Sequence, residues 1–218
     1  MAACHTGEIT LAQEVIAKLE SGMLCLAGRN FCGFALWEQA RATGGELLWR
    51  VQKRMALPCE QRLADNSYLS HIYPSLRDRR HDTGAVRVRV IEYTLEGVPG
   101  AEPVYRLITT LLDPEQAPAE ELAAQYAQRW EIETALDELK THLRGRQIVL
   151  RSKTPELVRQ EFYGLMLAHF AIRSLMHEAV LKADIDPDNL AFTHSVRVIR
   201  RKLPLFVAIP PSGQENLS

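Results

Sequence analysis

The sequence predicts a mixed α/β fold of the α+β kind, in one large domain or two small ones at ~150 residues per domain. Three observations predict this class: apolar residues at helical spacing over 8–20, a short apolar run at 23–27, and strict alternation over 86–90. The 218 residues are 46% hydrophobic and 24% charged, which are ordinary globular values. This composition excludes a disordered, collagen-like or coiled-coil chain.

The first quarter of the chain predicts two helix–strand pairs. Apolar side chains recur at i, i+3 and i+4 through residues 8–20, which is typical of an amphipathic helix. Residues 23–27 (MLCLA) are too few for a helix and end before Gly28, so they predict a strand buried on both faces. We expect a second helix over 33–42 and a second strand over 46–51.

The middle of the chain, residues 55–112, is rich in short β candidates. Apolar and charged residues alternate over 86–90 (VRVRV), and the segments 68–73 (YLSHIY) and 103–112 (PVYRLITTLL) are further candidates. Residues 96–103 (EGVPGAEP) have the composition of a hairpin turn. We therefore expect a β-rich segment inserted between two other parts of the fold.

The remainder of the chain predicts helices. A long helix is expected over 119–143. Thr154 and Pro155 predict the start of another, which runs to about residue 182, because Thr is a favourable cap and Pro suits the first helical position. A short basic helix over 194–202 precedes a Pro-rich tail.

Charge is distributed unevenly along the chain. Residues 1–139 contain 14 Lys and Arg against 20 Asp and Glu, a net charge of −6, whereas residues 140–202 contain 12 against 6, a net charge of +6. This division suggests a surface for an anionic polymer. A solvated helical surface explains the same numbers, and charge alone does not choose between the two.

Several classes of protein are excluded by local features. The N-terminal MAACHTGEIT has neither the basic start nor the apolar core of a signal peptide. No apolar run approaches the ~20 residues of a membrane span. Because no two cysteines form a CxxC pair or a zinc spacing, we expect reduced thiols in a cytoplasmic protein. The four cysteines are Cys4, Cys25, Cys32 and Cys59.

A polar stripe runs along the predicted 119–143 helix. At ~100° per residue, Tyr126, Arg129, Glu133 and Lys140 fall within an arc of about 60°, beside an apolar stripe. Ion pairs on a solvent-exposed face explain such a stripe on geometry alone.

The order of these residues supports a more specific interpretation. The segment YAQRWEIETALDELK fits Y-x2-R-x3-E-x6-K and resembles the signature of bacterial insertion-sequence transposases with a DDE catalytic triad and an RNase H-like fold. Residues 26–51 (LAGRNFCGFALWEQARATGGELLWRV) resemble the strand, helix and strand around the second catalytic aspartate of that family. The likeness extends from about residue 8 to about residue 205.

The resemblance implies roles for individual residues. Glu133 takes the place of the third catalytic acid and would be a Mg²⁺ ligand, and Gly28 stands at the position of the second aspartate. Tyr126, Arg129 and Lys140 would hold DNA phosphates and support the acid. The full set of expected DNA-binding residues is Tyr126, Arg129, Lys140, Arg29, Asn30, Arg144 and Arg146, with Arg151 and Lys153 extending the basic surface.

The sequence also departs from the family. Three carboxylates hold two Mg²⁺ ions in such sites, yet glycine at position 28 offers no ligand. The first aspartate belongs to a strand that residues 1–20 do not resemble. We therefore expect a truncated, catalytically inactive copy that does not bind Mg²⁺ productively, and we do not expect Glu38 or Asp65 to replace the missing acid. Glu133 should nevertheless lie within ~10 Å of Gly28, a span that two metal ions bridge.

These expectations define a partial RNase H-like fold. Its parts are a partial core over 1–54, a β-rich insertion over 55–112, the glutamate helix and helical basic region over 113–205, and a tail over 206–218. The leading hypothesis is a transposase that cuts element ends and transfers DNA strands, with DNA as partner and a homodimer in the synaptic complex. The alternatives are a non-catalytic DNA-binding or dimerising remnant and an unrelated α+β binding module. We expect a bacterial cytoplasmic protein, associated with the nucleoid when bound to DNA and without membrane contact.

Overall fold

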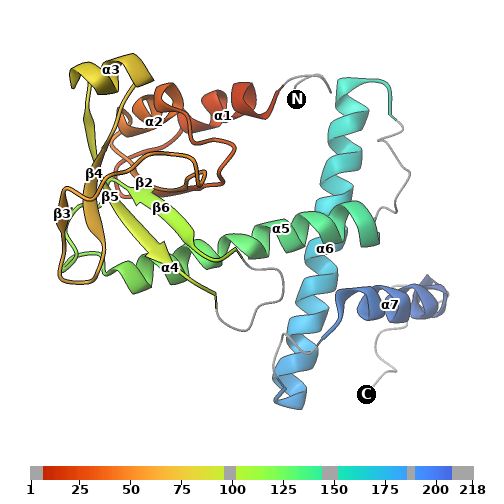
Figure 1. Cartoon of the computed structure of the whole chain (residues 1–218). Helices are drawn as coiled ribbons and strands as arrows, with labels where there is room; N and C mark the ends of the chain where they lie inside the picture. Colours follow the sequence, from red (N-terminus) through yellow and green to blue (C-terminus); the bar gives the residue numbers. More distant parts are fainter. Residues whose placement is uncertain (1–6, 96–101, 144–151, 186–189, 208–218) are drawn as a thin grey trace. The chain divides into compact units, whose positions relative to one another are not determined.

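The structure is a computed structural model that describes residues 7–95, 102–143, 152–185 and 190–207 (Figure 1). It contains two compact units, which divide between Arg129 and Trp130. The positions of the units relative to one another are not determined, so each unit is described by itself. No helix among the described residues is long and apolar enough to cross a membrane.

The first unit is built on a mixed sheet of six strands. Its order is β1-β2-β6-β5-β4-β3, with β1 and β2 parallel and every other neighbouring pair antiparallel. The strands are β1 (Leu24–Ala27), β2 (Glu46–Arg50), β3 (Gln61–Arg62), β4 (Tyr68–Ile72), β5 (Val86–Tyr93) and β6 (Tyr105–Thr109). The predicted α+β class is confirmed, and the mixed sheet is consistent with an RNase H-like type of fold.

Helices cover both faces of this sheet (Figure 1). Leu47 and Trp49 of β2 belong to a core cluster shared with the helices α1 and α2, whereas Leu48 belongs to a second cluster shared with α4. Successive side chains of a strand point to opposite faces, so β2 contributes to both cores. The helices of this unit are α1 (Glu8–Ile16), α2 (Phe34–Arg41), α3 (Leu76–His81) and α4 (Ala119–Ala127).

Strand β1 forms one edge of the sheet among the described residues, where it pairs with β2. Its four residues are all half-buried. Leu24 and Leu26 pack against the α4 side, and Cys25 and Ala27 pack against the α1–α2 side. The predicted strand is therefore confirmed, but the prediction that it is buried on both faces is wrong, because β1 has only one neighbouring strand among the described residues and both of its faces are only partly covered.

A buried arginine organises the opposite part of this unit. Arg89 of β5 has no exposed surface, and its Nη1 donates to the carbonyl oxygens of Leu111 (3.2 Å), Asp113 (3.3 Å) and Ala117 (2.7 Å). Its Nη2 forms an ion pair with Asp65. Buried charges are stable only when paired and hydrogen-bonded in this way.

Asp65 in turn fixes the start of α4. Its Oδ2 accepts a hydrogen bond from the amide of Ala119 at 2.9 Å, and its Oδ1 accepts from the hydroxyl of Ser67 at 2.5 Å. Burial alone would raise the pKa of Asp65, but these hydrogen bonds and the Arg89 charge together hold that pKa below its ordinary value. The carboxylate therefore remains charged at the N-terminus of α4, where a negative charge is favourable.

The second unit is helical. Its helices are α5 (Arg129–Asp137), the π-helix η1 (Glu138–Leu143), α6 (Pro155–Ala183) and α7 (Phe192–Val207). The predicted cap is confirmed, since the Thr154 hydroxyl accepts from the amide of Leu157 at 3.4 Å. A small core joins α6 to α7 and contains Ile172, Met176, Phe192 and Val196.

Several predicted boundaries are wrong. The helix predicted over 8–20 ends at Ile16, and the one predicted over 119–143 is divided into α4, α5 and η1. The sequence pattern does not predict helix α3, although Ser75 caps it by accepting from the amide of Asp78 at 3.2 Å. The short helix predicted near 194–202 extends over the whole of α7. Helix spacing identifies these segments but does not fix where they end.

The remaining predictions about organisation are not tested by the structure. The expected boundary at 54/55 falls between strands of one continuous sheet. The hairpin turn expected at 96–103 lies largely outside the described residues, although β5 and β6 pair antiparallel as a hairpin requires. The division into a core and an insertion therefore stays a prediction.

Replacing Arg89 with Met should strongly destabilise the protein. The substitution leaves the Asp65 carboxylate and three carbonyl groups without their donor, and breaking a buried charge pair costs about 3–5 kcal/mol. Arg87 lies on the same strand and is exposed, so R87M should change the free energy of unfolding by less than about 0.5 kcal/mol. Urea denaturation followed by circular dichroism compares the two variants, and equal midpoints would contradict this role of Arg89.

Candidate functional site

The candidate site of the first unit lies where β1 ends. Gly28 directly follows the strand and is half-buried. Its φ is not positive, and a Cβ added to it would meet no atom within 4 Å. The position is therefore open to a larger side chain, and glycine is not required there by the backbone.

Tyr126 connects the signature segment to this strand end. Its side chain is only 2% exposed, and its hydroxyl donates to the carbonyl oxygen of Ala27 at 3.3 Å. The guanidinium of Arg129 lies 5.3 Å from the centre of the Tyr126 ring, within the range of a cation–π contact. The structure thus attaches α4 to the residue immediately before Gly28. The expected contacts of Tyr126 and Arg129 with DNA stay predictions.

Arg29 and Asn30 form a turn beyond Gly28, in which the amide of Phe31 donates to the Gly28 carbonyl at 3.0 Å. Both side chains are exposed. Arg29 forms an ion pair with Glu102, Nη1 to Oε1 at 3.0 Å. Sequence reasoning did not identify Glu102, because it lies more than seventy residues along the chain, next to the turn expected at 96–103.

The acid of the signature belongs to the second unit. Glu133 lies on α5 and Lys140 on η1, and both are exposed. Because Gly28 belongs to the first unit, the expected distance of ~10 Å between Glu133 and Gly28 stays a prediction. Arg144, Arg146 and Arg151 lie outside the described residues.

A buried carboxylate follows the signature acid. Glu138 is 5% exposed; its Oε2 lies 2.8 Å from Nε2 of His169, and Arg173 of α6 pairs with both of its oxygens. The carboxylate thus links η1 to α6. Sequence reasoning missed it because an α-helical projection turns Glu138 away from the apolar stripe, and because its partners His169 and Arg173 lie more than thirty residues further along the chain.

Neither of the carboxylates considered as a replacement acid is available. Asp65 holds Arg89 and the start of α4, and Glu38 pairs with Arg41 on α2 at 2.8 Å. Mg²⁺ prefers several oxygen ligands in octahedral geometry. Across the described parts of the chain, no group of three or more His, Cys, Asp or Glu side chains is placed to hold a metal ion. The expectation that this chain does not bind Mg²⁺ productively stays a prediction, because Glu133 and Gly28 belong to different units.

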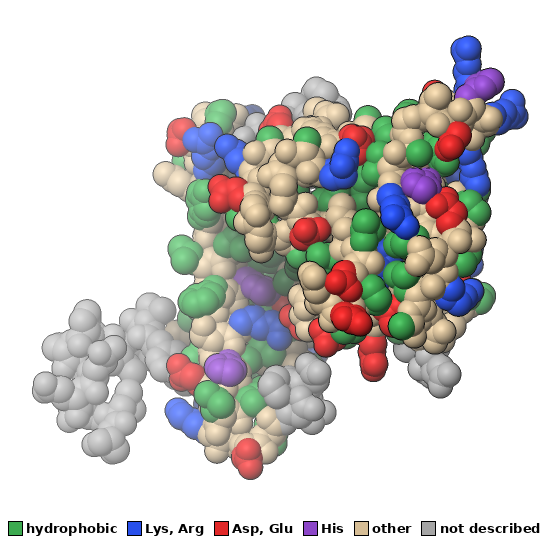
Figure 2. All heavy atoms as spheres, turned by 90° about the vertical axis from the view of Figure 1, so that its left-hand side faces the viewer, with side chains coloured by type: hydrophobic (Ala, Val, Ile, Leu, Met, Phe, Trp, Pro, Cys, Tyr) green, Lys and Arg blue, Asp and Glu red, His purple; other side chains and the backbone are tan. Residues whose placement is uncertain are grey.

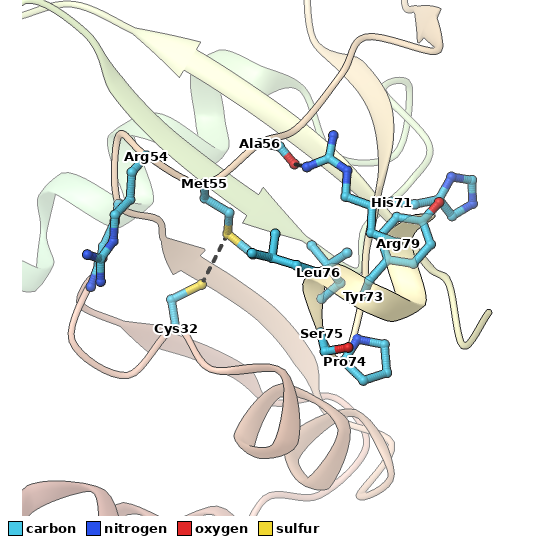
Figure 3. Close-up of a pocket in the computed structure, with 12 residues that line it drawn as sticks. Cys32, Arg54, Met55, Ala56, His71, Tyr73, Pro74, Ser75, Leu76 and Arg79 are labelled. Carbon is cyan, nitrogen blue, oxygen red and sulfur yellow. Dashed lines mark hydrogen bonds between the residues drawn. The ribbon is translucent and has the colours of Figure 1, made fainter. Parts of the chain in front are cut away.

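A cavity of about 620 Å³ lies between the turn after β1, the loop after β2 and the start of α3 (Figure 3). Arg54, His71 and Arg79 line it, and no Asp or Glu does. The thiol of Cys32 lies 4.0 Å from the sulfur of Met55, and burial raises the pKa of that thiol to about 11. A thiol that stays protonated at neutral pH is a poor nucleophile, so Cys32 is not suited to nucleophilic chemistry in this cavity.

Charges of both signs are mixed on the face of the molecule that Figure 2 shows. Asp and Glu side chains lie among Lys and Arg side chains over much of the face in Figure 2. The positive excess of 140–202 comes mainly from α7 and the undescribed segment 144–151, whereas the cations and acids of α6 balance.

A mixed sheet with the signature helix tied to one strand end is the arrangement expected of an RNase H-like catalytic domain. Comparison with known families agrees: residues 1–171 match the model described as the transposase DDE domain, and the chain belongs to this family. It is also similar to the transposase InsG for insertion sequence element IS4 of Escherichia coli (strain K12), with 27% identity over 202 residues. The match covers 90% of this chain and 45% of that relative, so the chain spans less than half of the relative's length.

Substitutions at two glycines test whether position 28 is open. We expect Gly28→Ala and Gly28→Asp to change the free energy of unfolding by less than about 0.5 kcal/mol, because nothing crowds the site. Gly22→Ala is the matched control: its Cβ also meets no atom within 4 Å, but its φ is +88°. A Cβ at such a φ costs about 1–2 kcal/mol. Urea midpoints measure both effects, and equal losses at the two positions would contradict the openness of Gly28.

Proposed function

We propose that this chain descends from a transposase that cleaves and transfers DNA strands with Mg²⁺, and that it does not itself catalyse the reaction. Glu133 is the third acid of the lineage, and Tyr126, Arg129 and Lys140 are its signature partners. The hydrogen bond from Tyr126 to Ala27 is the observation that carries the assignment, because it joins the signature segment to the strand end at which the second acid belongs. DNA is the partner and the cytoplasm the place of action.

The residue at position 28 supports the absence of activity. Gly28 provides no carboxylate at the second acid position, and a site for two metal ions needs several fixed carboxylates. One carboxylate at position 133 binds Mg²⁺ too weakly to organise the reaction.

A nicking assay tests this proposal. We expect no chelator-sensitive nicking of a supercoiled plasmid that carries the element ends, in the presence of Mg²⁺, by the chain or by its G28D variant. Restored activity should need an acid at position 28 together with the remaining acids of an intact relative. In a variant that carries them, Glu133→Gln should remove nicking, because the amide keeps the size of the carboxylate but not its charge. Chelator-sensitive nicking by the unmodified chain, lost in E133Q, would show that the chain is active.

The alternative function is a non-catalytic DNA-binding or dimerising remnant. The net charge of +6 over residues 140–202 favours it, because neutralising phosphates releases counterions and supplies sequence-independent affinity. Such a protein would occupy element ends without cutting them. A homodimer on paired ends is part of this alternative.

Charge reversal tests the basic region. We expect R144E/R146E to abolish most retention of a DNA duplex in a gel-shift titration, with binding that weakens steeply as salt rises. The matched control is R77E/R80E, which reverses two exposed arginines on α3. Equal retention by the two double variants would mean that residues 144 and 146 belong to a solvated surface.

A further inference from the structure

Three cations meet one carboxylate at the end of the β1–β2 pair. Arg29 and Arg50 both contact Oε1 of Glu102, at 3.0 and 2.8 Å, and Nζ of Lys53 lies 3.8 Å from Oε2. Because Ala27 is in register with Trp49, Gly28 and Arg50 follow at the same C-terminal end of the two parallel strands, where Arg50 is the last residue of β2. We call Arg29, Arg50 and Lys53 the strand-end cluster.

The parts of this arrangement differ in exposure. The side chain of Arg50 is 13% exposed and its guanidinium lies 4.5 Å from the centre of the Tyr105 ring. The hydroxyl of Tyr105 also accepts a hydrogen bond from the amide of Glu102 at 3.3 Å. By contrast, the side chains of Arg29 and Lys53 are 57% and 65% exposed. Arg50 is thus held in place beside Glu102, whereas the exposed side chains of Arg29 and Lys53 are able to change partners.

There is room for a second anion. Cavities of about 470 and 320 Å³ share Val51, Lys53 and Glu102 in their walls, and one is also lined by Arg29 and the other by Arg50. Guanidinium groups bind carboxylates and phosphates with the same planar geometry. Three cations around one carboxylate leave positive charge in excess, which attracts an anion and disfavours a divalent cation.

Glu102 keeps its charge in this environment. Burial alone would raise the pKa of Glu102, but the hydrogen bond from Arg50 and the charges of Arg50, Lys53 and Arg29 hold that pKa below its ordinary value. At neutral pH the Glu102 carboxylate is therefore the anion that pairs with the three cations of the strand-end cluster.

We propose that the strand-end cluster binds a phosphate group of the DNA backbone and that Glu102 is its internal competitor. An arriving phosphodiester takes the donors of Arg29 and Lys53, while Glu102 remains with Arg50. No covalent step is involved. This inference rests on the proposed DNA binding. It adds a phosphate site and a carboxylate, Glu102, that lowers the affinity of that site for DNA. The strand end at which the family holds metal ions then holds phosphate in this chain.

Neutralising Glu102 should strengthen DNA binding. We expect Glu102→Gln to bind a short fluorescein-labelled duplex roughly twofold to fivefold more tightly by fluorescence anisotropy, the upper range of an exposed charge pair. The matched control is E38Q, which removes the same charge from the Glu38–Arg41 pair on α2. E38Q should change the affinity less than about twofold, because Arg41 is outside the strand-end cluster.

A double-variant comparison locates the effect. R29M/K53M should weaken binding and lower the slope of log affinity against log salt by about two, one for each cation that no longer neutralises a phosphate. In that background E102Q should have no further effect, because the cations for which Glu102 competes are gone. The side chains of Arg29 and Lys53 are exposed, so the fold is expected to persist, and circular dichroism checks it.

The outcomes separate the inference from the function on which it rests. If E102Q and E38Q bind DNA with equal affinity, Glu102 does not compete with DNA phosphate, and the proposed DNA binding itself is unaffected. Thermal stabilisation of E102Q by pyrophosphate, lost in R29M/K53M and accompanied by no DNA binding, assigns the cluster to small phosphates and overturns its DNA role. Binding of neither probe by any variant overturns both proposals.

Discussion

The interaction on which the first unit most depends is the pairing of Arg89 with Asp65. Arg89 gathers the carbonyl groups of the segment that follows β6, and Asp65 receives the first amide of α4. Together they determine where α4 begins and therefore where its last turn places Tyr126. The hydrogen bond from Tyr126 to the end of β1 thus depends on the Arg89–Asp65 pair, although that pair lies on β5 and in the loop before β4. Because a lone buried charge is costly, the network is stable only as a whole.

Local patterns are sufficient to find most of the elements. The strands β2, β4, β5 and β6 and the helices α2 and α6 all lie within segments that alternation, helical spacing or a Thr–Pro start identifies. These signals come from residues a few positions apart, so one sequence contains them in full. The ends of the helices are harder to predict from the sequence, since packing decides whether a last turn is retained.

The residues that sequence reasoning missed are fixed by contacts between distant parts of the chain rather than by local patterns. Arg89 occupies a polar position of an alternating strand and is nevertheless buried, because α4 covers that face and Asp65 neutralises it. Glu102 meets Arg29 across more than seventy residues, and Glu138 is paired with His169 and Arg173 across more than thirty. None of these contacts has a local pattern. The motif itself identified the signature residues, but the expected distance from Glu133 to Gly28 depends on how the two units sit together and stays a prediction.

The open space around Gly28 has a consequence for how this position can vary. A side chain whose Cβ meets no atom within 4 Å can be exchanged without adjustment of its neighbours, so glycine and aspartate at this position leave the same packing. The stability of the sheet and the chemistry at the strand end can then be selected independently of one another. A change between an acid and glycine here is reversible in a single step, because neither residue requires a compensating change elsewhere.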